Sequence, residues 1–183
     1  MGTMLLLLGF LAVFINPLQG DESFQFVNNG YNGETVYHTV NINQQYKIAV
    51  FNVYSGRQTS NAVFDYKQNI VAYHMPYRGI CVLAHMDIDT FPGLGIFEDM
   101  MHKREQKKEL EELKKQYFIT NQQIYDLAQF GAAVQGLCWG VPTYLAREFS
   151  PPPQKHGVGI GAQGCAGIHF LFIHVGLCAG FHL

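Results

Sequence analysis

The chain has 183 residues and a mass of 20.6 kDa, which is enough for one domain with a tail. Hydrophobic residues make up 48% of the chain, so it can bury a core and is too apolar for a disordered protein. A formal net charge of −2 and a pI of about 6.4 give no support to a nucleic-acid-binding function.

The first 20 residues have the layout of a secretory signal peptide. Met4 to Ile15 form an apolar run, and Pro17 and Gly20 follow it. The alternative is a membrane anchor, but the run is shorter than the roughly 20 apolar residues that a membrane span needs. We therefore expect residues 1–20 to be removed and the mature, secreted chain to start near Asp21.

Four cysteines are present, at positions 81, 138, 165 and 178. In the oxidising environment that secretion implies, an even number of cysteines favours two disulfides. Four cysteines allow three pairings, and the sequence alone does not choose between them. Because no CxxC motif occurs, the sequence gives no support to a redox enzyme or a zinc ribbon.

The first half of the mature chain is predicted to form a series of short strands. Residues 21–33 are polar and rich in Asn and Gly, which indicates a flexible lead-in. From Thr35 apolar and polar residues alternate, so that Val36, His38, Val40 and Ile42 share one face of a strand. Further β-prone runs follow at residues 47–54, 62–66, 70–74 and 80–86. Their short polar connections predict an antiparallel meander.

The hydrophobic period then changes to that of a helix. Phe97, Met100 and Met101 lie at helical spacing and lead into a strongly charged run at residues 102–116. This run has high helix propensity but no apolar face in its middle turns, which indicates a solvated helix or a mobile connector. A second helix is predicted from Thr120, with a capping box formed with Gln123, to Cys138.

The last part of the chain is a linker followed by an uncharged tail. Residues 150–164 are rich in Pro and then Gly, which is typical of a linker. The tail after it carries the apolar residues Ile168, Phe170, Leu171, Phe172, Ile173 and Val175. Such a charge-free, β-prone run aggregates when it is exposed. We expect it to fold as a strand or hairpin covered by the preceding domain, with Gly164, Gly167, Gly176 and Gly180 at loop or bulge positions.

A search for chemical motifs finds no catalytic, cofactor or metal site. Residues 159–164 match GxGxxG, but dinucleotide binding needs a strand before this motif and a helix after it, and neither is predicted. His169, His174 and His182 accompany two cysteines in the tail. If residues 168–175 form one straight strand, His169 and His174 point to opposite faces, and a shared metal is not expected.

Asp65 lies in the β-prone run AVFDY and has two interpretations. The first is an edge-strand carboxylate that accepts hydrogen bonds from the amides of the following turn. The second is a carboxylate that faces the core, where burial would raise its pKa and make it sensitive to pH.

Several stretches together resemble the gastrokines, which are secreted stomach proteins with a BRICHOS domain. The resemblance is carried by FDYKQNIVAYH, RGICVLAHMD, LCWGVPTY and the ending GVGIGAQGCAG…GLCAGFHL, and it covers nearly the whole chain. It implies an α+β fold in which a five-stranded antiparallel sheet packs between two helices, with the β-prone segment added at the C-terminus. It also implies that Cys81 pairs with Cys138, which leaves Cys165 with Cys178, and it marks Asp65 as the family's recurring aspartate.

The resemblance divides the chain into the signal peptide (1–20), an N-terminal segment (21–52), the BRICHOS domain (53–147) and a linker with the apolar segment (148–183). It implies a non-enzymatic mucosal protein whose domain shields β-prone segments from aggregation and which restrains epithelial growth. The expected partners are its own C-terminal segment, other β-prone polypeptides, and secreted mucosal proteins or an epithelial receptor. The alternative is a growth-regulating factor that acts through a receptor without chaperone activity.

Overall fold

The computed structural model describes residues 21–29, 33–56, 59–149 and 164–179. The predicted signal peptide and nearly all of the predicted linker lie outside these residues. The described strands are β1 (Glu22–Asn29), β2 (Thr35–Asn43), β3 (Ile48–Tyr54), β4 (Ser60–Asp65), β5 (Ile70–Met75), β6 (Ile80–His85), β7 (Leu113–Ile124), β8 (Thr143–Glu148), β9 (Gly164–Phe170) and β10 (Ile173–Ala179). The described helices are α2 (Leu94–Glu105) and α3 (Ala132–Cys138), with short 3-10 turns η2 (Pro76–Arg78) and η3 (Ala128–Phe130).

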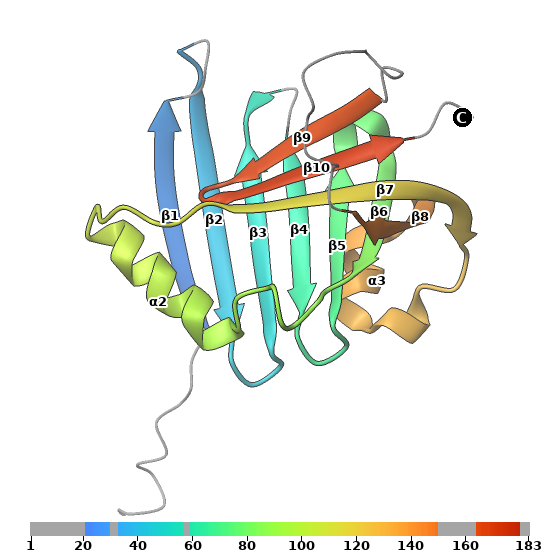
Figure 1. Ribbon diagram of the computed structural model, residues 1–183, viewed down its shortest axis with the longest axis horizontal. Helices are drawn as coiled ribbons and strands as arrows, with labels where there is room; N and C mark the ends of the chain where they lie inside the picture. The colour runs from blue at the N-terminus through green and yellow to red at the C-terminus, as the bar shows by residue number, and fades with distance from the viewer. Residues whose placement is uncertain (1–20, 30–32, 57–58, 150–163, 180–183) are drawn as a thin grey trace, which may run out of the picture.

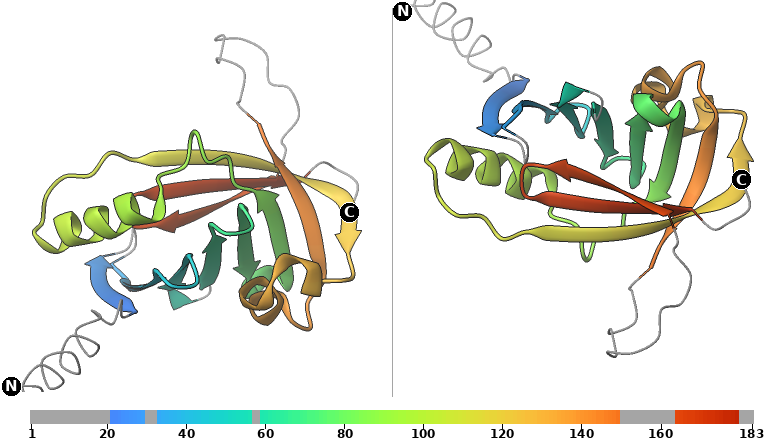
Figure 2. Two further views of the ribbon diagram at one scale, coloured as in Figure 1. Left: turned by 90° about the horizontal axis from the view of Figure 1, so that it is seen from below. Right: turned by 90° about the horizontal axis from the view of Figure 1, so that it is seen from above.

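All ten described strands belong to one sheet, in the order β1-β2-β3-β4-β5-β6-β8-β7-β10-β9. Neighbouring strands are antiparallel except for the parallel pairs β6–β8 and β7–β10. The sheet folds over on itself, so that β7, β9 and β10 cross in front of the layer formed by β1 to β6 (Figures 1 and 2). The core lies between the two layers, where each covers the apolar face of the other.

The α+β class holds, but the prediction of a five-stranded antiparallel sheet is wrong. The predicted meander exists as β2 to β6, and each of its strands lies within two residues of its predicted bounds. Along β2 the side chains of His38, Val40 and Ile42 are buried on one face, as the alternation predicts. Such a meander has an apolar inner face that needs cover, and the later strands provide it.

Residues 22–29 form a strand and not a flexible lead-in. β1 pairs with β2 along its whole length, from Glu22 opposite Ile42 to Asn29 opposite Thr35. Phe24 is buried in the core and Phe26 is half-buried beside it. Phe24 and Phe26 are two positions apart, so they lie on the same face of β1, while most of their neighbours are polar. Burial of that one face is enough to hold such a strand on a sheet.

The charged region after α2 differs most from its prediction. The helix ends at Glu105, and the strand β7 begins at Leu113. The predicted helix N-terminus, Thr120, lies within β7, and its hydroxyl donates a hydrogen bond to the carbonyl of Leu145 at 2.8 Å. In β7 the side chains of Lys115 and Tyr117 are buried, so pairing with β8 and β10 overrides helix propensity.

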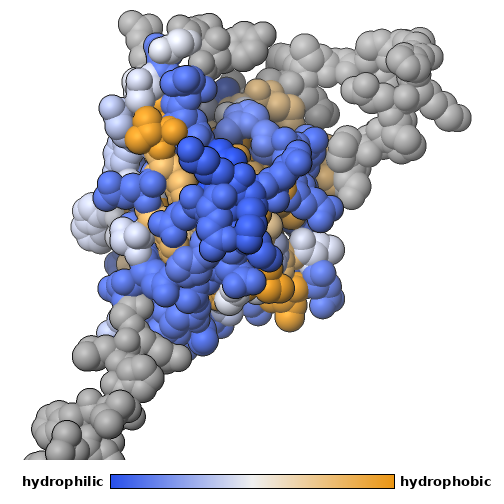
Figure 3. Space-filling model, turned by 90° about the vertical axis from the view of Figure 1, so that its left-hand side faces the viewer, coloured by the Kyte–Doolittle hydropathy of each residue, from blue (hydrophilic) through white to orange (hydrophobic). Residues whose placement is uncertain are grey.

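The two described helices cover opposite faces of the first layer, as predicted. α2 buries Leu94, Phe97 and Met101 in the core between the layers. α3 buries Val134 and Cys138 against the outer side of the layer, and Figure 2 shows it on the side opposite β7, β9 and β10. The face that carries β1 and α2 is mostly hydrophilic at its surface (Figure 3). Neither helix is long and apolar enough to cross a membrane.

Candidate functional site

The apolar C-terminal segment folds as a hairpin, formed by β9 and β10 and closed by Leu171 and Phe172. Its inward-facing side chains are almost fully buried: Ala166, Ile168, Phe170, Phe172, Ile173, Val175 and Leu177 are all at most 6% exposed. Leu171, at the turn, is half-buried. The hairpin is therefore a structural part of the core, lying on the inner face of the first layer.

Aromatic contacts attach this hairpin to the layer beneath it. The ring of Phe170 lies 6.1 Å from that of Phe51 on β3 and 6.3 Å from that of Tyr73 on β5. The ring of Phe172 lies 5.8 Å from that of Phe97 on α2. The contacts involve three separate elements, so the hairpin can be held only by the assembled domain.

The turn does not lie where the glycines suggested. Gly167 and Gly176 face each other within the paired strands, and the chain reverses in the middle of the apolar run. For the same reason the expectation that His169 and His174 point to opposite faces is wrong. They are cross-strand neighbours with ring centroids 4.5 Å apart.

Two disulfides are formed, and they follow the pairing that the resemblance implies. Cys81 on β6 is bonded to Cys138 at the end of α3, with a Cα–Cα distance of 5.5 Å. Cys165 is bonded to Cys178 directly across the hairpin, with a Cα–Cα distance of 3.9 Å. The first disulfide fixes α3 to the outer face of the first layer, and the second fixes the hairpin register.

Asp65 is both buried and bonded to the turn that follows β4. The residue is 5% exposed, and its Oδ1 accepts hydrogen bonds from the amides of Lys67 and Gln68, both at 3.0 Å. Gly131, just before α3, approaches this carboxylate so closely that an added Cβ would lie 3.4 Å from Oδ2. The structure thus combines features of both interpretations of Asp65, a buried carboxylate and a turn cap.

Asp65→Ala is expected to lower the free energy of unfolding by about 1–2 kcal/mol, because two turn amides lose their acceptor. Asp65→Asn retains an acceptor oxygen and is expected to cost less than about 1 kcal/mol. Urea denaturation at pH 7 measures both effects. Asp126→Ala serves as a matched control, because Asp126 makes one such bond, to the amide of Ala128, at an exposed position. An Asp65→Asn variant more stable than the wild type would contradict the turn-capping role.

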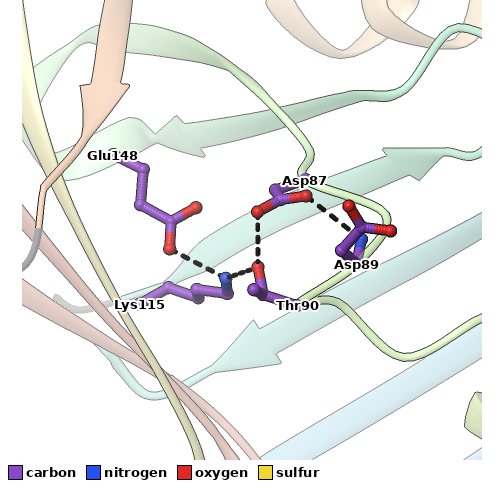
Figure 4. A network of polar contacts seen from close by, with 5 residues as sticks. All are labelled: Asp87, Asp89, Thr90, Lys115 and Glu148. Atoms are coloured by element: carbon purple, nitrogen blue, oxygen red, sulfur yellow. Dashed lines mark hydrogen bonds and ion pairs between the residues drawn. The ribbon is translucent and has the colours of Figure 1, made fainter.

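A buried lysine on β7 contacts β8 and the loop between β6 and α2 (Figure 4). Lys115 is 4% exposed, and its ammonium group contacts Glu148 at 2.8 Å and the hydroxyl of Thr90 at 2.7 Å. That hydroxyl in turn donates to Asp87 at 3.1 Å. A hydrogen bond from the amide of Asp89, with a second from the Thr90 hydroxyl, holds the pKa of Asp87 below its usual value. The network connects β7, β8 and the loop between β6 and α2.

His38 is a buried histidine whose Nδ1 has no hydrogen-bond partner among the described residues. It is 6% exposed, on β2, in the row of core side chains that includes Val40. Burial, with a contribution from the positive charge of Arg104, lowers the pKa of His38 to about 4. The imidazole is therefore neutral in the folded protein at pH 7.

This histidine makes the fold sensitive to acid. In the unfolded chain His38 takes up a proton near pH 6.5, whereas in the fold it does so only near pH 4. The unfolded state therefore binds more protons between these values, and the free energy of unfolding falls as the pH falls through this window. We expect His38→Phe to reduce the loss between pH 7 and pH 4 by about 2 kcal/mol, after allowance for solvent screening. Denaturation curves at both pH values measure it.

His85→Gln is the control for that experiment, because His85 lies on the exposed end of β6. It is expected to leave the acid sensitivity of stability unchanged. An equal loss of stability on acidification in His38→Phe and the wild type would show that His38 is not responsible.

Among the described residues, one group of side chains has the arrangement of metal ligands: Glu22, Glu98 and His102, with ligand atoms within 4.8 Å of one another. His102 Nε2 lies 3.2 Å from Glu22 Oε2, and Gln44 is hydrogen-bonded to Glu98. Burial and the Glu98 charge raise the pKa of Glu22, while His102 acts in the opposite direction. The side chains of Glu22 and His102 are more than one-third exposed, and their contact accounts for the arrangement as a link between β1 and α2.

Sequence reasoning placed His38 on the buried face of its strand but missed Lys115 as a structural residue and misplaced the hairpin turn. Lys115 stood in a run of charges that is typical of a solvated surface, and only the alternation with Tyr117 and Ile119 indicated that it faces inward. The turn could have been found from the cysteines. A disulfide between Cys165 and Cys178 across a hairpin places the reversal midway between them, at Leu171 and Phe172.

Comparison with known proteins relates the chain to one group. Residues 56–145 match the family model of the BRICHOS domain. Gastrokine-2 of Rattus norvegicus is 27% identical over 179 residues, which cover 94% of this chain and 95% of the relative. Gastrokine-1 of Mus musculus is 26% identical over 134 residues (69% and 70%), and Gastrokine-3 of Mus musculus is 30% identical over 121 residues (64% and 61%). No solved structure matches the chain significantly.

Proposed function

This chain belongs to the gastrokine family of BRICHOS-domain proteins, and on that basis we propose that it is a secreted, non-enzymatic chaperone of the gastric mucosa. In this role it shields β-prone segments from aggregation, beginning with its own C-terminal hairpin, and it thereby protects the mucosa and restrains epithelial growth. The apolar run at residues 4–15 and the two disulfides support a secretory route, since disulfides persist in oxidising compartments.

The observation that carries the chaperone role is the burial of the hairpin. Its two strands contain no Asp, Glu, Lys or Arg, and its inward side chains form a continuous apolar row. A free peptide of this kind has only copies of itself to pair with, which leads to fibrils. In the fold its apolar face lies on the first layer and β10 pairs with β7, so the apolar face and one of the two edges of the hairpin are covered.

The test is a fibrillation assay. A synthetic peptide of residues 164–183 is followed by thioflavin fluorescence alone and with the oxidised mature protein at one-tenth of the peptide concentration. We expect the peptide to form fibrils and the protein to lengthen the lag phase severalfold. An unrelated secreted β-sandwich domain of similar size is the control, and it should leave the lag phase unchanged.

Two results of this assay would contradict the proposal. The peptide could remain monomeric, so that there is nothing to shield, or the protein could act no better than the control domain. Because the assay contains no cells, suppression in it also separates shielding from the alternative, signalling through an epithelial receptor.

A further inference from the structure

A groove of about 760 Å³ lies between the hairpin and the ends of the first strands, and we call it the β9 groove. Its first wall is five consecutive residues of β9, from Cys165 to His169, with Leu171 at the turn. Its second wall comes from the ends of β1 to β4, including Val36, His38 and Val53, and from η2. Consecutive residues of one strand line a groove together only when the edge of that strand faces it. The groove therefore opens onto the edge of β9.

This edge has no neighbouring strand among the described residues, since β9 stands last in the sheet. In a hairpin with a two-residue turn, the closing pair, Phe170 and Ile173, exchanges backbone hydrogen bonds, and every second pair outward does the same. Cys165, Gly167 and His169 therefore direct their backbone N–H and C=O groups away from β10 and into the groove. The short Cα–Cα distance of 3.9 Å between Cys165 and Cys178 agrees, because pairs without hydrogen bonds lie closer together.

The second wall of the groove combines two valines with polar side chains and one positive charge. Val36 and Val53 contribute apolar surface, and Arg78 is the charged side chain among the described residues that line the groove. The buried Nδ1 of His38 has no hydrogen-bond partner within the part of the chain that the structure describes. Arg104, which donates to Asn28 at 3.5 Å, adds a second positive charge near His38. A peptide strand that carries no charge except one acidic group complements the positive charges of Arg78 and Arg104.

We propose that the β9 groove binds an extended peptide strand that is uncharged except for an acidic residue at its end. The backbone of this strand pairs with the backbone of Cys165, Gly167 and His169. This rests on the proposed function and specifies its client: a single β-strand of another polypeptide. The edge from Cys165 to His169 spans about 17 Å, which matches about five residues of the client. The bound strand becomes the next strand of the second layer, and its inward side chains cover Val36 and Val53.

Gly167 offers a matched pair of variants. Gly167→Pro removes the central edge N–H and places the proline ring in the groove. Gly167→Ala retains the N–H, and its Cβ would meet only His169 Nε2, at an ordinary contact distance of 3.4 Å. The two variants thus differ in the edge hydrogen bond, and thermal melting shows whether both keep the fold.

The probe is an end-blocked, fluorescein-labelled octapeptide, Glu-Val-Thr-Val-Thr-Val-Thr-Glu, titrated with the oxidised mature protein and followed by fluorescence anisotropy. We expect Gly167→Ala to bind within twofold of the wild type and Gly167→Pro to bind at least tenfold more weakly. The same octapeptide with alternate amides N-methylated on its pairing edge is expected to lose binding to the same degree. Wild-type affinity in a folded Gly167→Pro variant overturns the proposal.

A charge exchange tests the groove without touching the hairpin. Arg78 is exposed, so Arg78→Glu should preserve the fold. We expect it to weaken binding of the glutamate peptide about fivefold and to strengthen binding of a version with lysine at both ends. Equal affinity of the two peptides for both proteins overturns the proposal. A wild-type protein that is dimeric, and that Gly167→Pro makes monomeric, also overturns it, because the groove is then occupied by a second copy of the chain.

The outcomes separate this proposal from the function on which it rests. Suppression of fibrillation by a wild-type protein that does not bind the octapeptide rejects the groove and leaves the chaperone role. Binding of the octapeptide without suppression rejects the chaperone role and leaves the groove. Loss of both activities in Gly167→Pro, with both retained in Gly167→Ala, supports the two together.

Discussion

Phe170→Ala is expected to lower the free energy of unfolding by about 3–5 kcal/mol, the range for removing a buried aromatic ring. Phe170 is 1% exposed and is the contact of the hairpin with both Phe51 and Tyr73. The cavity would lie between the two layers, where neither layer can move without losing strand pairs. Since a domain of this size has a total stability of about 5–15 kcal/mol, one substitution removes a large part of it.

Guanidinium chloride denaturation of the oxidised protein measures this effect. His169→Ala is the control, since His169 neighbours Phe170 on the same strand and its side chain is exposed on the outer face. It is expected to cost less than about 0.5 kcal/mol. A cost below about 1 kcal/mol for Phe170→Ala would mean that the hairpin is not packed on the first layer in solution.

Removal of the disulfide between Cys81 and Cys138 is expected to cost about 4 kcal/mol in the chain-entropy description. The two cysteines are separated by 57 positions, so the crosslink removes much of the freedom of the unfolded chain. Both residues are completely buried against the outer face of the first layer. The double variant Cys81→Ala/Cys138→Ala leaves no free thiol and no buried polar group, and its denaturation curve gives the loss directly.

The second disulfide provides the comparison. Cys165 and Cys178 are separated by 13 positions, and Cys165→Ala/Cys178→Ala is expected to cost about 3 kcal/mol by the same relation. The wild type and both variants should be measured under the same non-reducing conditions. A larger loss from the hairpin disulfide than from the long one would contradict the entropic origin and indicate that strain or packing dominates.

The sequence predicts a strand correctly where the hydrophobic pattern of the segment agrees with the strand pairing that the segment makes in the fold. β2 to β6 alternate with period two and are separated by short polar turns, and both signals survive in the structure. In β7 Lys115 is itself buried and is flanked by Lys114 and Gln116, so the local preference of this segment is helical until β8 and β10 pair with it. Because β8 and β10 are separated from β7 in the sequence, no pattern within residues 113–124 predicts that β7 pairs with them.

In the C-terminal hairpin, too, one feature follows from the sequence and another does not. The burial of Ile168, Phe170 and Val175 follows from their hydrophobicity, and a hairpin was a reasonable expectation. The residues of the turn give no local signal for it, because Leu171 adopts a φ of 55°, a conformation that Gly or Asn normally supplies. Packing of Leu171 against the core compensates for that conformation, and such compensation cannot be seen in the sequence.

The position of β10 in the sheet has a consequence for folding during synthesis. β10 pairs in parallel with β7, and β8 in parallel with β6, so the sheet closes only after the last described strand has left the ribosome. Until then Phe51 and Tyr73, on the inner side of the first layer, lack the cover that Phe170 provides. Long-range β pairing of this kind folds slowly, in about milliseconds to seconds. The nascent chain should therefore depend on the folding helpers of its compartment, and their capacity should limit how much folded protein a cell produces.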